Sequence, residues 1–327
     1  MSLIKKYISR LIKKVSPNLR VRTAEIVAPI IEAGRTNSYV ETTSNKADTL
    51  HRHIKENSER DLKKAFEEQV RNAVRRIGRG RTILAIDTTS ELYYGENGKL
   101  NVRQIKHEKG ADEAFYYAVI SIVEPKPLPL MAIPYKTGDD LSKIVKELIN
   151  YVKTLPFIIE YVLFDRGFYI GDLIGFLLEK RVKYIIFVPE NKAMKRYIAE
   201  TDRIKTFRHK MVWTKDASEW QVETNIVIIK DLMNEGKKDY WCFATNLFQS
   251  LHLIYRYKQR WQIETDFRMQ DEAKIKTKSN VHIVRYFYFL TSLVLLANWE
   301  VNRSIHPEIC FKKYLKQIEE HFRVEIT

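Results

Sequence analysis

The stretch YRYKQRWQIETDFRMQDEAKIKTK, from Tyr255 to Lys278, consists of strong helix formers without proline or glycine and predicts one helix. Tyr257, Arg260 and Glu264 are spaced i, i+3 and i+7, so their side chains lie on one face of that helix. Arg268 continues the same stripe. Amphipathic helices usually bury an apolar stripe, whereas here an aromatic ring, a guanidinium and a carboxylate share a face. This face is either solvated and held by i,i+4 ion pairs such as Arg260–Glu264, or part of a functional site.

The chain carries a large positive charge that is concentrated near its beginning. Its 327 residues have a net charge of +15, with 45% hydrophobic and 30% charged residues, which is a globular composition. The first 82 residues hold 19 lysines and arginines against 9 aspartates and glutamates. Such a segment favours a polyanionic partner, most often nucleic acid, with an anionic membrane surface as the weaker alternative.

Apolar runs that end at an acidic residue mark two buried strands. TILAID, from Thr82 to Asp87, and FIIEYVLFD, from Phe157 to Asp165, both finish at an aspartate. Further strands are predicted at Phe115–Val123, Leu130–Ile133 and Tyr184–Val188, and helices at Asp140–Lys153 and Gly171–Lys180. The order of these elements indicates an α/β fold, with early strands in a meander followed by β-α-β units around a mainly buried sheet.

Residues 1–81 are predicted to form a basic helical module that precedes the α/β core. Its helices are expected at 4–15, 24–33 and 47–77, with the second ended by Gly34 and a polar loop at 35–46. This module either touches DNA backbone or is a helical appendage whose basic face is solvated.

A β-rich insertion is predicted at residues 190–246, between the first part of the core at 82–189 and a C-terminal helical part at 247–327. Its strands are expected at 221–229 and 240–244. Basic side chains there alternate with aromatic ones, which suits contact with nucleic acid. Alternatively, the tryptophans of the insertion form a minor core of their own. Beyond it, helices are predicted at 281–303 and 312–327.

The chain shows no signal for export or membrane insertion. Cys242 and Cys310 are far apart and form no CxxC motif, which indicates reduced, buried thiols in an intracellular protein. The basic N-terminus lacks the apolar core of a signal peptide, and the longest apolar run, Tyr286–Trp299, is shorter than a bilayer span. We therefore expect a cytoplasmic, nucleoid-associated protein without membrane attachment.

Three carboxylates are candidates for chemistry, namely Asp87, Asp165 and Glu264. In open α/β sheets, functional groups gather beyond the carboxyl ends of the strands, where both aspartates are expected. Carboxylates held close together repel one another unless a cation lies among them, and hard oxygen ligands suit Mg²⁺ or Mn²⁺. Two such ions can clamp a phosphodiester, one activating the attacking water or 3′-hydroxyl and the other stabilising the leaving oxygen. Taken singly, however, a strand-end aspartate is often only a helix N-cap or turn residue.

Four motifs occur in a consistent order along the chain. They are ILAIDTT at 83–89, LFDRGFY at 163–169, YKQRWQIETDFR at 257–268 and IKTKS at 275–279. The first two resemble the first- and second-aspartate motifs of the DDE transposases of bacterial and archaeal insertion sequences. The third resembles the Y-xx-R-xxx-E part of that group's Y-R-E-K signature, and the fourth is similar to a segment common in archaeal members. This resemblance spans about residues 82–302. It implies a ribonuclease H-like mixed sheet flanked by helices, with a β-rich insertion and an N-terminal helical module.

The resemblance also implies roles for individual residues. Asp87, Asp165 and Glu264 would be the catalytic residues and would bind two Mg²⁺ or Mn²⁺ ions. Tyr257 and Arg260 would contact the phosphate backbone at the transposon end.

One position departs from the signature, because its lysine is replaced by Asp271. We expect Arg268 or Lys274 to supply the missing phosphate contact, and Arg166, which follows Asp165, is a further candidate for binding DNA.

The resulting hypothesis is a DNA transposase that cleaves at the element ends and joins the 3′-hydroxyl to target DNA. Its partner would be double-stranded DNA, both element ends and target, and a homodimer on DNA is expected because two ends are cut. Two alternatives remain at this point. One is a ribonuclease H-like nuclease without strand transfer, and the other is an inactive DNA-binding relic.

Overall fold

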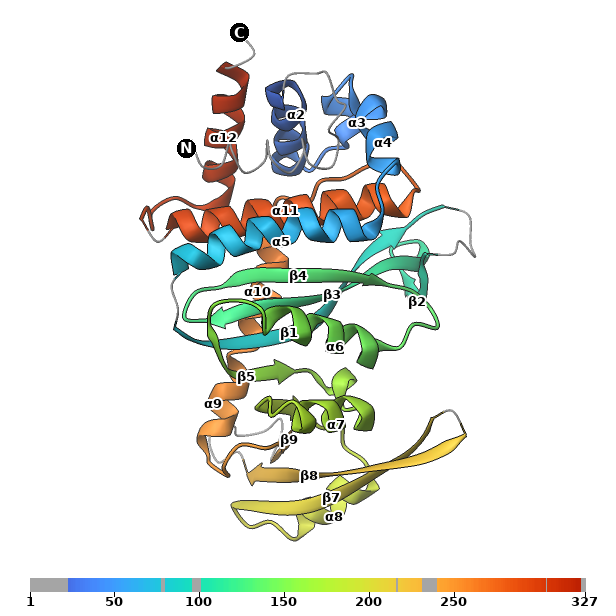
Figure 1. Cartoon of the computed structure of the whole chain (residues 1–327), viewed down its shortest axis with the longest axis vertical. Coiled ribbons are helices and arrows are strands. Elements are labelled where there is room, and N and C mark those ends of the chain that lie inside the picture. The colour runs from blue at the N-terminus through green and yellow to red at the C-terminus, as the bar shows by residue number, and fades with distance from the viewer. Residues whose placement is uncertain are drawn as a thin grey trace.

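The computed structural model of the chain describes residues 23–77, 80–95, 101–215, 217–230, 240–303 and 305–324. The helix expected at 4–15 lies outside these residues. A single twisted sheet runs through the middle and lower parts of the view in Figure 1, and a layer of helices lies above it. The predicted mixed α/β architecture is confirmed.

The sheet of the described residues has nine strands in the order β2-β3-β1-β5-β6-β9-β8-β7, with β4 also paired to β3. The strands are β1 (Arg81–Tyr93), β2 (Arg103–Glu108), β3 (Ala111–Glu124), β4 (Leu128–Tyr135), β5 (Ile158–Phe164), β6 (Tyr184–Phe187), β7 (Ile204–Lys215), β8 (Ser218–Lys230) and β9 (Tyr240–Thr245). Strand β5 is parallel to β1 and β6, whereas the other pairs are antiparallel. Strand β1 lies between β3, to which it is antiparallel, and β5, to which it is parallel.

Helices cover both faces of this sheet. Helices α6 (Leu141–Val152) and α7 (Gly171–Glu179) pack on one face, and α9 (His252–Lys258) and α10 (Trp261–Asp271) pack on the other. Successive residues of a strand point to opposite faces. Accordingly, Ile86 belongs to the apolar cluster that includes α6 and α7, and Ala85 to the one that includes α9 and α10.

Except for α8 (Lys192–Ala199), which lies beside β7, the remaining helices form the layer above β4 in Figure 1. They are α2 (Thr23–Thr36), α3 (Val40–Thr43), α4 (Ala47–Lys55), α5 (Glu59–Ile77), α11 (His282–Arg303) and α12 (Phe311–Val324). Helix α5 packs against α11 and β4, and α2 packs against α12. The apolar helix predicted at 281–303 is confirmed as α11, and no described helix is both long enough and apolar enough to span a bilayer.

The single helix predicted for the stretch from Tyr255 to Lys278 is wrong. It is two helices, α9 and α10, joined at Gln259 and Arg260, and it ends at Asp271. At the junction the Arg260 amide donates to the Tyr257 carbonyl, an i→i−3 bond that tightens the turn. Beyond Ala273 the chain is extended, because Lys276 forms a β-bridge with Tyr39.

Two further helix predictions need correction. The helix expected at 47–77 is divided into α4 and α5, because Ser58 accepts a hydrogen bond from the Asp61 amide and so caps α5. Helix α2 does not stop at Gly34 but continues to Thr36. Within the loop expected at 35–46, residues 40–43 form the short helix α3.

The β-rich segment predicted at 190–246 adds strands to the core sheet. Strand β9 pairs with β6, and β8 and β7 follow outward, with α8 (Lys192–Ala199) preceding them. Trp241 stacks on Phe243 in the apolar cluster, whereas Trp220 is exposed. The boundaries at residues 81, 189 and 246 stay predictions. Of the two free cysteines, Cys242 is buried as expected but Cys310 is exposed.

Candidate active site

The register of two parallel strands brings Asp87 and Asp165 together. The last parallel pair between β1 and β5 is Ile86 with Phe164, so both aspartates are the next residues of adjacent strands. Ile86 and Phe164 face α6 and α7, so the aspartates face the opposite side, where α10 lies. Neighbouring strands are about 5 Å apart, which places the two carboxylates side by side.

The prediction that the first strand ends at Asp87 is wrong. Strand β1 continues to Tyr93, because its antiparallel pairing with β3 extends to the pair Tyr93 and Glu113. Asp87 therefore lies within a strand, where its backbone pairs with Val119 of β3. Asp165 follows β5 directly, at the start of the short 3₁₀ helix η1 (Arg166–Phe168).

Arg260 joins Asp87 to Glu264. Its Nη1 donates to Asp87 Oδ2 at 2.6 Å, and its Nη2 donates to Glu264 Oε1 at 2.6 Å. The two carboxylates are thus separated by one guanidinium and two hydrogen bonds. The turn between α9 and α10 aims this side chain at β1, and Arg260 is only 7% exposed. The i,i+4 pair expected from the sequence is present, but its arginine is buried instead of solvated.

Tyr257 lies in the core beneath Arg260. Its ring is 4% exposed and packs against Phe187 and Phe243, with ring centroids 5.7 and 5.1 Å apart. The Arg260 guanidinium lies 5.7 Å from the centroid of the Tyr257 ring. In this arrangement Tyr257 supports the arginine from below, and its contact with DNA phosphate stays a prediction.

Burial has the largest effect on the electrostatics of the site, and the charge of Arg260 opposes it. Burial raises the pKa of Asp87, and the neighbouring charges of Asp165 and Glu264 raise it further. The Arg260 guanidinium and the hydrogen bond from the Thr88 amide to Asp87 Oδ1, at 2.8 Å, act in the opposite direction. A cation is therefore needed among these carboxylates, and Arg260 supplies it.

The donor chemistry of this site fits a hard divalent ion. Three carboxylates around one position, with a cation required between them, are the ligand set that Mg²⁺ and Mn²⁺ prefer. In the described residues no three histidine, cysteine, aspartate or glutamate side chains are grouped to hold a metal. At this site Arg260 instead bonds one oxygen of Asp87 and one of Glu264. An ion would have to take the place of the guanidinium.

The other predicted DNA contacts lie on the rim of the site. Arg166 is exposed in η1, and Arg268 is exposed on α10, where its Nη2 donates to Thr265 Oγ1 at 3.1 Å. Lys274 is engaged with carboxylates, since its Nζ lies 3.8 Å from Glu91 Oε1 and 4.0 Å from Asp271 Oδ1. Their contacts with DNA stay predictions.

Two features beside the site were not predicted from the sequence. One is the contact of Arg260 with Asp87, which joins residues 173 positions apart. The other is Glu91, a buried carboxylate four residues after Asp87 on the same face of β1. A period of two from Asp87 along the strand was the signal that could have found Glu91.

Comparisons with known proteins match a family model to part of the chain and a solved structure to its fold. Residues 142–279 match a family model described as the transposase DDE domain. Among solved structures, the chain is similar to a piggyBac transposase in a synaptic complex with hairpin DNA, determined by cryo-EM. The identity is 16% and the TM-score is 0.58, over 98% of this chain and 77% of that one. No curated protein matches the chain.

The fold and the matched domain both resemble those of transposases. The mixed α/β fold, which the sequence predicted to be ribonuclease H-like, is similar to that of a transposase. Residues 142–279, which include Asp165 and Glu264, match the transposase DDE domain, which supports the resemblance to DDE transposases. Asp87 lies outside the matched segment. The archaeal type and the Y-R-E-K subgroup stay predictions. Proteins of this family generally depend on divalent metal ions.

Proposed function

We propose that this protein cleaves phosphodiester bonds at the ends of a mobile DNA element and joins the resulting 3′-hydroxyl to target DNA. The observation that carries this proposal is that Arg260 bonds both Asp87 and Glu264, and that the charge of Asp165 acts on Asp87 and Arg260. A carboxylate cluster of this kind on a ribonuclease H-like sheet has no evident structural purpose, since burial of like charges is unfavourable.

Asp87, Asp165 and Glu264 would hold two divalent ions. When bound, such ions supply an activated oxygen nucleophile and stabilise the leaving oxygen of the phosphodiester. The chain contributes the positions of the oxygens. Strand pairing fixes Asp87, while Glu264, whose side chain is 49% exposed, approaches from α10 and is open to substrate. One rigid and one accessible carboxylate allow the site to close around DNA.

Arg260 would act in two states. Without an ion, it neutralises Asp87 and Glu264. Once released from them, its guanidinium lies beside the reacting centre and can bind a phosphate with two parallel hydrogen bonds. The stacked ring of Tyr257 and the tight turn before α10 keep the side chain within reach of both positions.

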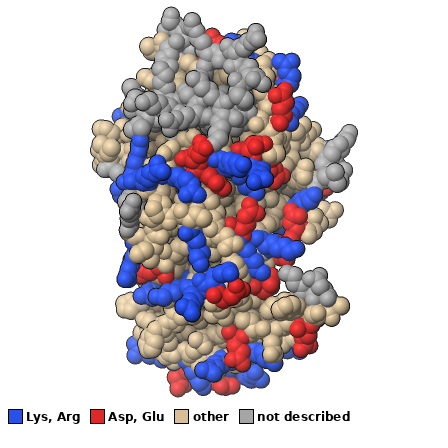
Figure 2. Space-filling view, viewed as in Figure 1, with Lys and Arg blue, Asp and Glu red and all other residues tan. Residues whose placement is uncertain are grey.

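The partner would be double-stranded DNA, at the element ends and at the target. The net charge of +15 favours a polyanion, and the similar solved structure is a synaptic complex with hairpin DNA. Figure 2 shows that basic side chains on one face are spread over the described surface with acidic ones between them. Cutting two ends would require two protomers, which supports a homodimer on DNA.

The test is a cleavage and strand-transfer assay with Mg²⁺ or Mn²⁺, on DNA that carries the inverted repeats flanking the gene. Asp87→Asn, Asp165→Asn and Glu264→Gln should each abolish cleavage while binding of the duplex survives. Asp202→Asn, an exposed aspartate remote from the site in the fold, is the matched control and should retain activity.

The outcomes separate the alternatives. Nicked DNA without any joined product would identify a nuclease. An unmodified protein that binds DNA but neither nicks nor joins it, with all three site variants behaving identically, would identify a DNA-binding relic and refute the proposal.

A further inference from the structure

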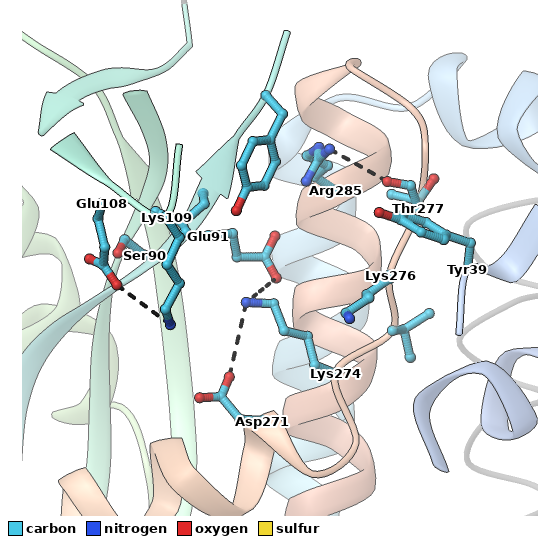
Figure 3. A pocket seen from close by; sticks show the side chains of 13 residues that line it. Tyr39, Ser90, Glu91, Glu108, Lys109, Asp271, Lys274, Lys276, Thr277 and Arg285 are labelled. Atoms are coloured by element: carbon cyan, nitrogen blue, oxygen red, sulfur yellow. Dashed lines mark hydrogen bonds and ion pairs between the residues drawn. The ribbon is translucent and has the colours of Figure 1, made fainter. Parts of the chain in front are cut away.

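A polar pocket lies next to the carboxylate site. It has a volume of about 590 Å³ and is formed by the second half of β1, the end of α10 and the extended segment that follows. Figure 3 shows Glu91, Asp271, Lys274 and Lys276 around it. Glu91 follows Asp87 by four residues on β1, about 13 Å along the strand. The pocket is therefore within a few base-pair steps of the catalytic carboxylates, given a rise of about 3.4 Å per step.

Residues 274–279, KIKTKS, alternate in burial, and residues 274–277 form one wall of this pocket. Ile275 and Thr277 are each 4% exposed and belong to the interior. In an extended chain, successive side chains point to opposite sides, so Lys274, Lys276 and Lys278 share the outer side. In Figure 3 the amines of Lys274 and Lys276 both lie on the pocket side of the segment. Alternate side chains are about 7 Å apart, a spacing comparable to that of neighbouring phosphates on one DNA strand. We call these three residues the lysine ladder.

The backbone of the ladder is held by the loop after α2. The Val40 amide donates to the Lys276 carbonyl at 2.9 Å, which forms the bridge between Tyr39 and Lys276. Glu41 Oε1 accepts hydrogen bonds from Thr277 Oγ1 at 2.6 Å and from the Lys278 amide at 2.9 Å. The lysines are thus presented by a fixed segment, which reduces the entropy lost when they bind a ligand.

A second anchor comes from α11. Arg285 donates through Nε to the Ser279 carbonyl at 2.9 Å and through Nη2 to the Thr277 carbonyl at 3.4 Å. Arg285 also lies 5.2 Å from the centroid of the Phe115 ring. The segment is therefore tied both to the loop after α2, which is far away in the sequence, and to the first turn of α11, which follows it directly.

The carboxylates that line the pocket are already paired with cations, so Lys276 and Lys278 keep a positive charge that is uncompensated in the described part of the chain. The lining carboxylates each have a cation, since Lys109 lies 3.7 Å from Glu108, and Lys274 lies near both Glu91 and Asp271. Among the described residues, no carboxylate lies within ion-pair distance of Lys276 or Lys278. Lys278 instead lies 5.9 Å from the centroid of the Tyr39 ring. Two rigidly presented ammonium groups beside the site suit an extended anion.

We infer that the lysine ladder, above all Lys276 and Lys278, binds successive phosphates of one DNA strand next to the catalytic carboxylates. This inference rests on the proposed function and names a binding surface for its substrate. Tyr39 and the mouth of the pocket would lie against the sugar side of the same strand. Neutralised phosphates release counterions, so each contact adds to the salt dependence of binding.

The test is the affinity for a fluorescein-labelled duplex of arbitrary sequence, measured by anisotropy in EDTA between about 50 and 200 mM salt. The variant Lys276→Ala/Lys278→Ala should reduce the slope of log binding constant against log salt concentration by about 1.8 in magnitude. The factor by which affinity falls between the two salt concentrations is then about twelvefold smaller than in the unmodified protein. Lys312→Ala/Lys313→Ala removes two exposed lysines of α12 and is the matched control, with an unchanged slope. An unchanged slope in the ladder variant would overturn the inference.

Substitution of Glu41 provides a second test, because electrostatics and loss of the anchor predict opposite changes in DNA affinity. Loss of a carboxylate increases the positive charge, so long-range electrostatics alone predict that Glu41→Ala binds DNA more tightly. Loss of the fixed ladder predicts weaker binding, towards that of the double lysine variant. Glu41→Gln keeps an acceptor and should bind at least as well as the unmodified protein. Equal or tighter binding by Glu41→Ala would contradict the inference.

Failure of the ladder and failure of the proposed function are distinguishable. The binding assay contains EDTA and requires no cleavage, whereas the catalytic test measures cleavage with the ion present. If the protein cleaves DNA but the lysine ladder variant has an unchanged salt slope, the ladder inference alone is refuted. If the ladder variant has a reduced slope but the unmodified protein never cleaves DNA, the ladder inference stands and the proposed transposase activity is refuted.

Discussion

Arg260→Ala should destabilise this protein far more than an ordinary arginine substitution. The Arg260 side chain is 9% exposed and its two nitrogens each bind a carboxylate at 2.6 Å. Its removal leaves Asp87, whose side chain is 17% exposed, beside Asp165 and without a cation. Breaking one partner of a buried ion pair costs about 3–5 kcal/mol, because the remaining charge is uncompensated.

The matched control lies two turns further along the same helix. Arg268 is exposed and makes one hydrogen bond, to Thr265 Oγ1. Arg268→Ala should change the free energy of unfolding by no more than about 0.5 kcal/mol, as for most surface substitutions. The difference between the two variants therefore isolates the buried contact with the carboxylates from the loss of a positive charge.

The assay is denaturant unfolding at pH 7, first in EDTA and then with Mn²⁺. A ligand that binds only the folded state adds about 2.7 kcal/mol at a concentration of one hundred times its dissociation constant. The stabilisation by Mn²⁺ should be larger in Arg260→Ala than in the unmodified protein, since the ion no longer displaces a guanidinium. The reasoning is refuted if Arg260→Ala costs no more than Arg268→Ala, or if Mn²⁺ stabilises both proteins equally.

Three further variants test the packing of the fold. Burial raises the pKa of Asp266 to about 8, from an ordinary value of 3.8. The folded state then binds a proton that the unfolded state has lost, so stability falls by about 1.4 kcal/mol per pH unit between these values. Asp266→Asn should remove this slope and gain about 3 kcal/mol relative to the unmodified protein between pH 5 and 7.5 in urea unfolding. An unchanged slope would place the titration elsewhere. Gly34→Ala would put a Cβ 2.8 Å from the Ala273 carbonyl oxygen and should cost about 1–3 kcal/mol. Gly175→Ala, with open space around it, should stabilise α7 by up to about 1 kcal/mol, and equal melting temperatures for both glycine variants would argue against the close approach.

Much of the core could be predicted because its signals are local. The apolar runs before Asp87 and Asp165 predicted β1 and β5, and the helical pattern after Asp140 predicted α6 within one residue at each end. Asp140 indeed caps that helix through the Ser142 amide. Periodicity and capping depend on neighbouring residues, so the chain displays them without its fold.

Predictions failed where a distant partner decided the outcome. The stretch from Tyr255 to Lys278 has helix formers throughout, yet it turns at Arg260 and becomes extended after Ala273. Tertiary contacts override the propensity of a few residues, because each propensity amounts to about 0.7 kcal/mol or less. In the same way, pairing with β3 carried β1 past Asp87 to Tyr93.

The sequence by itself determined the chemical groups of the site and their order, because residue identity and local pattern belong to the chain alone. It indicated Asp87, Asp165 and Glu264, and the motifs around them. Only the tertiary structure decided that Arg260 lies between two of these carboxylates and that Tyr257 is buried beneath it. Those contacts join residues up to 173 positions apart, and strand register and helix packing, which no local pattern encodes, set their distances.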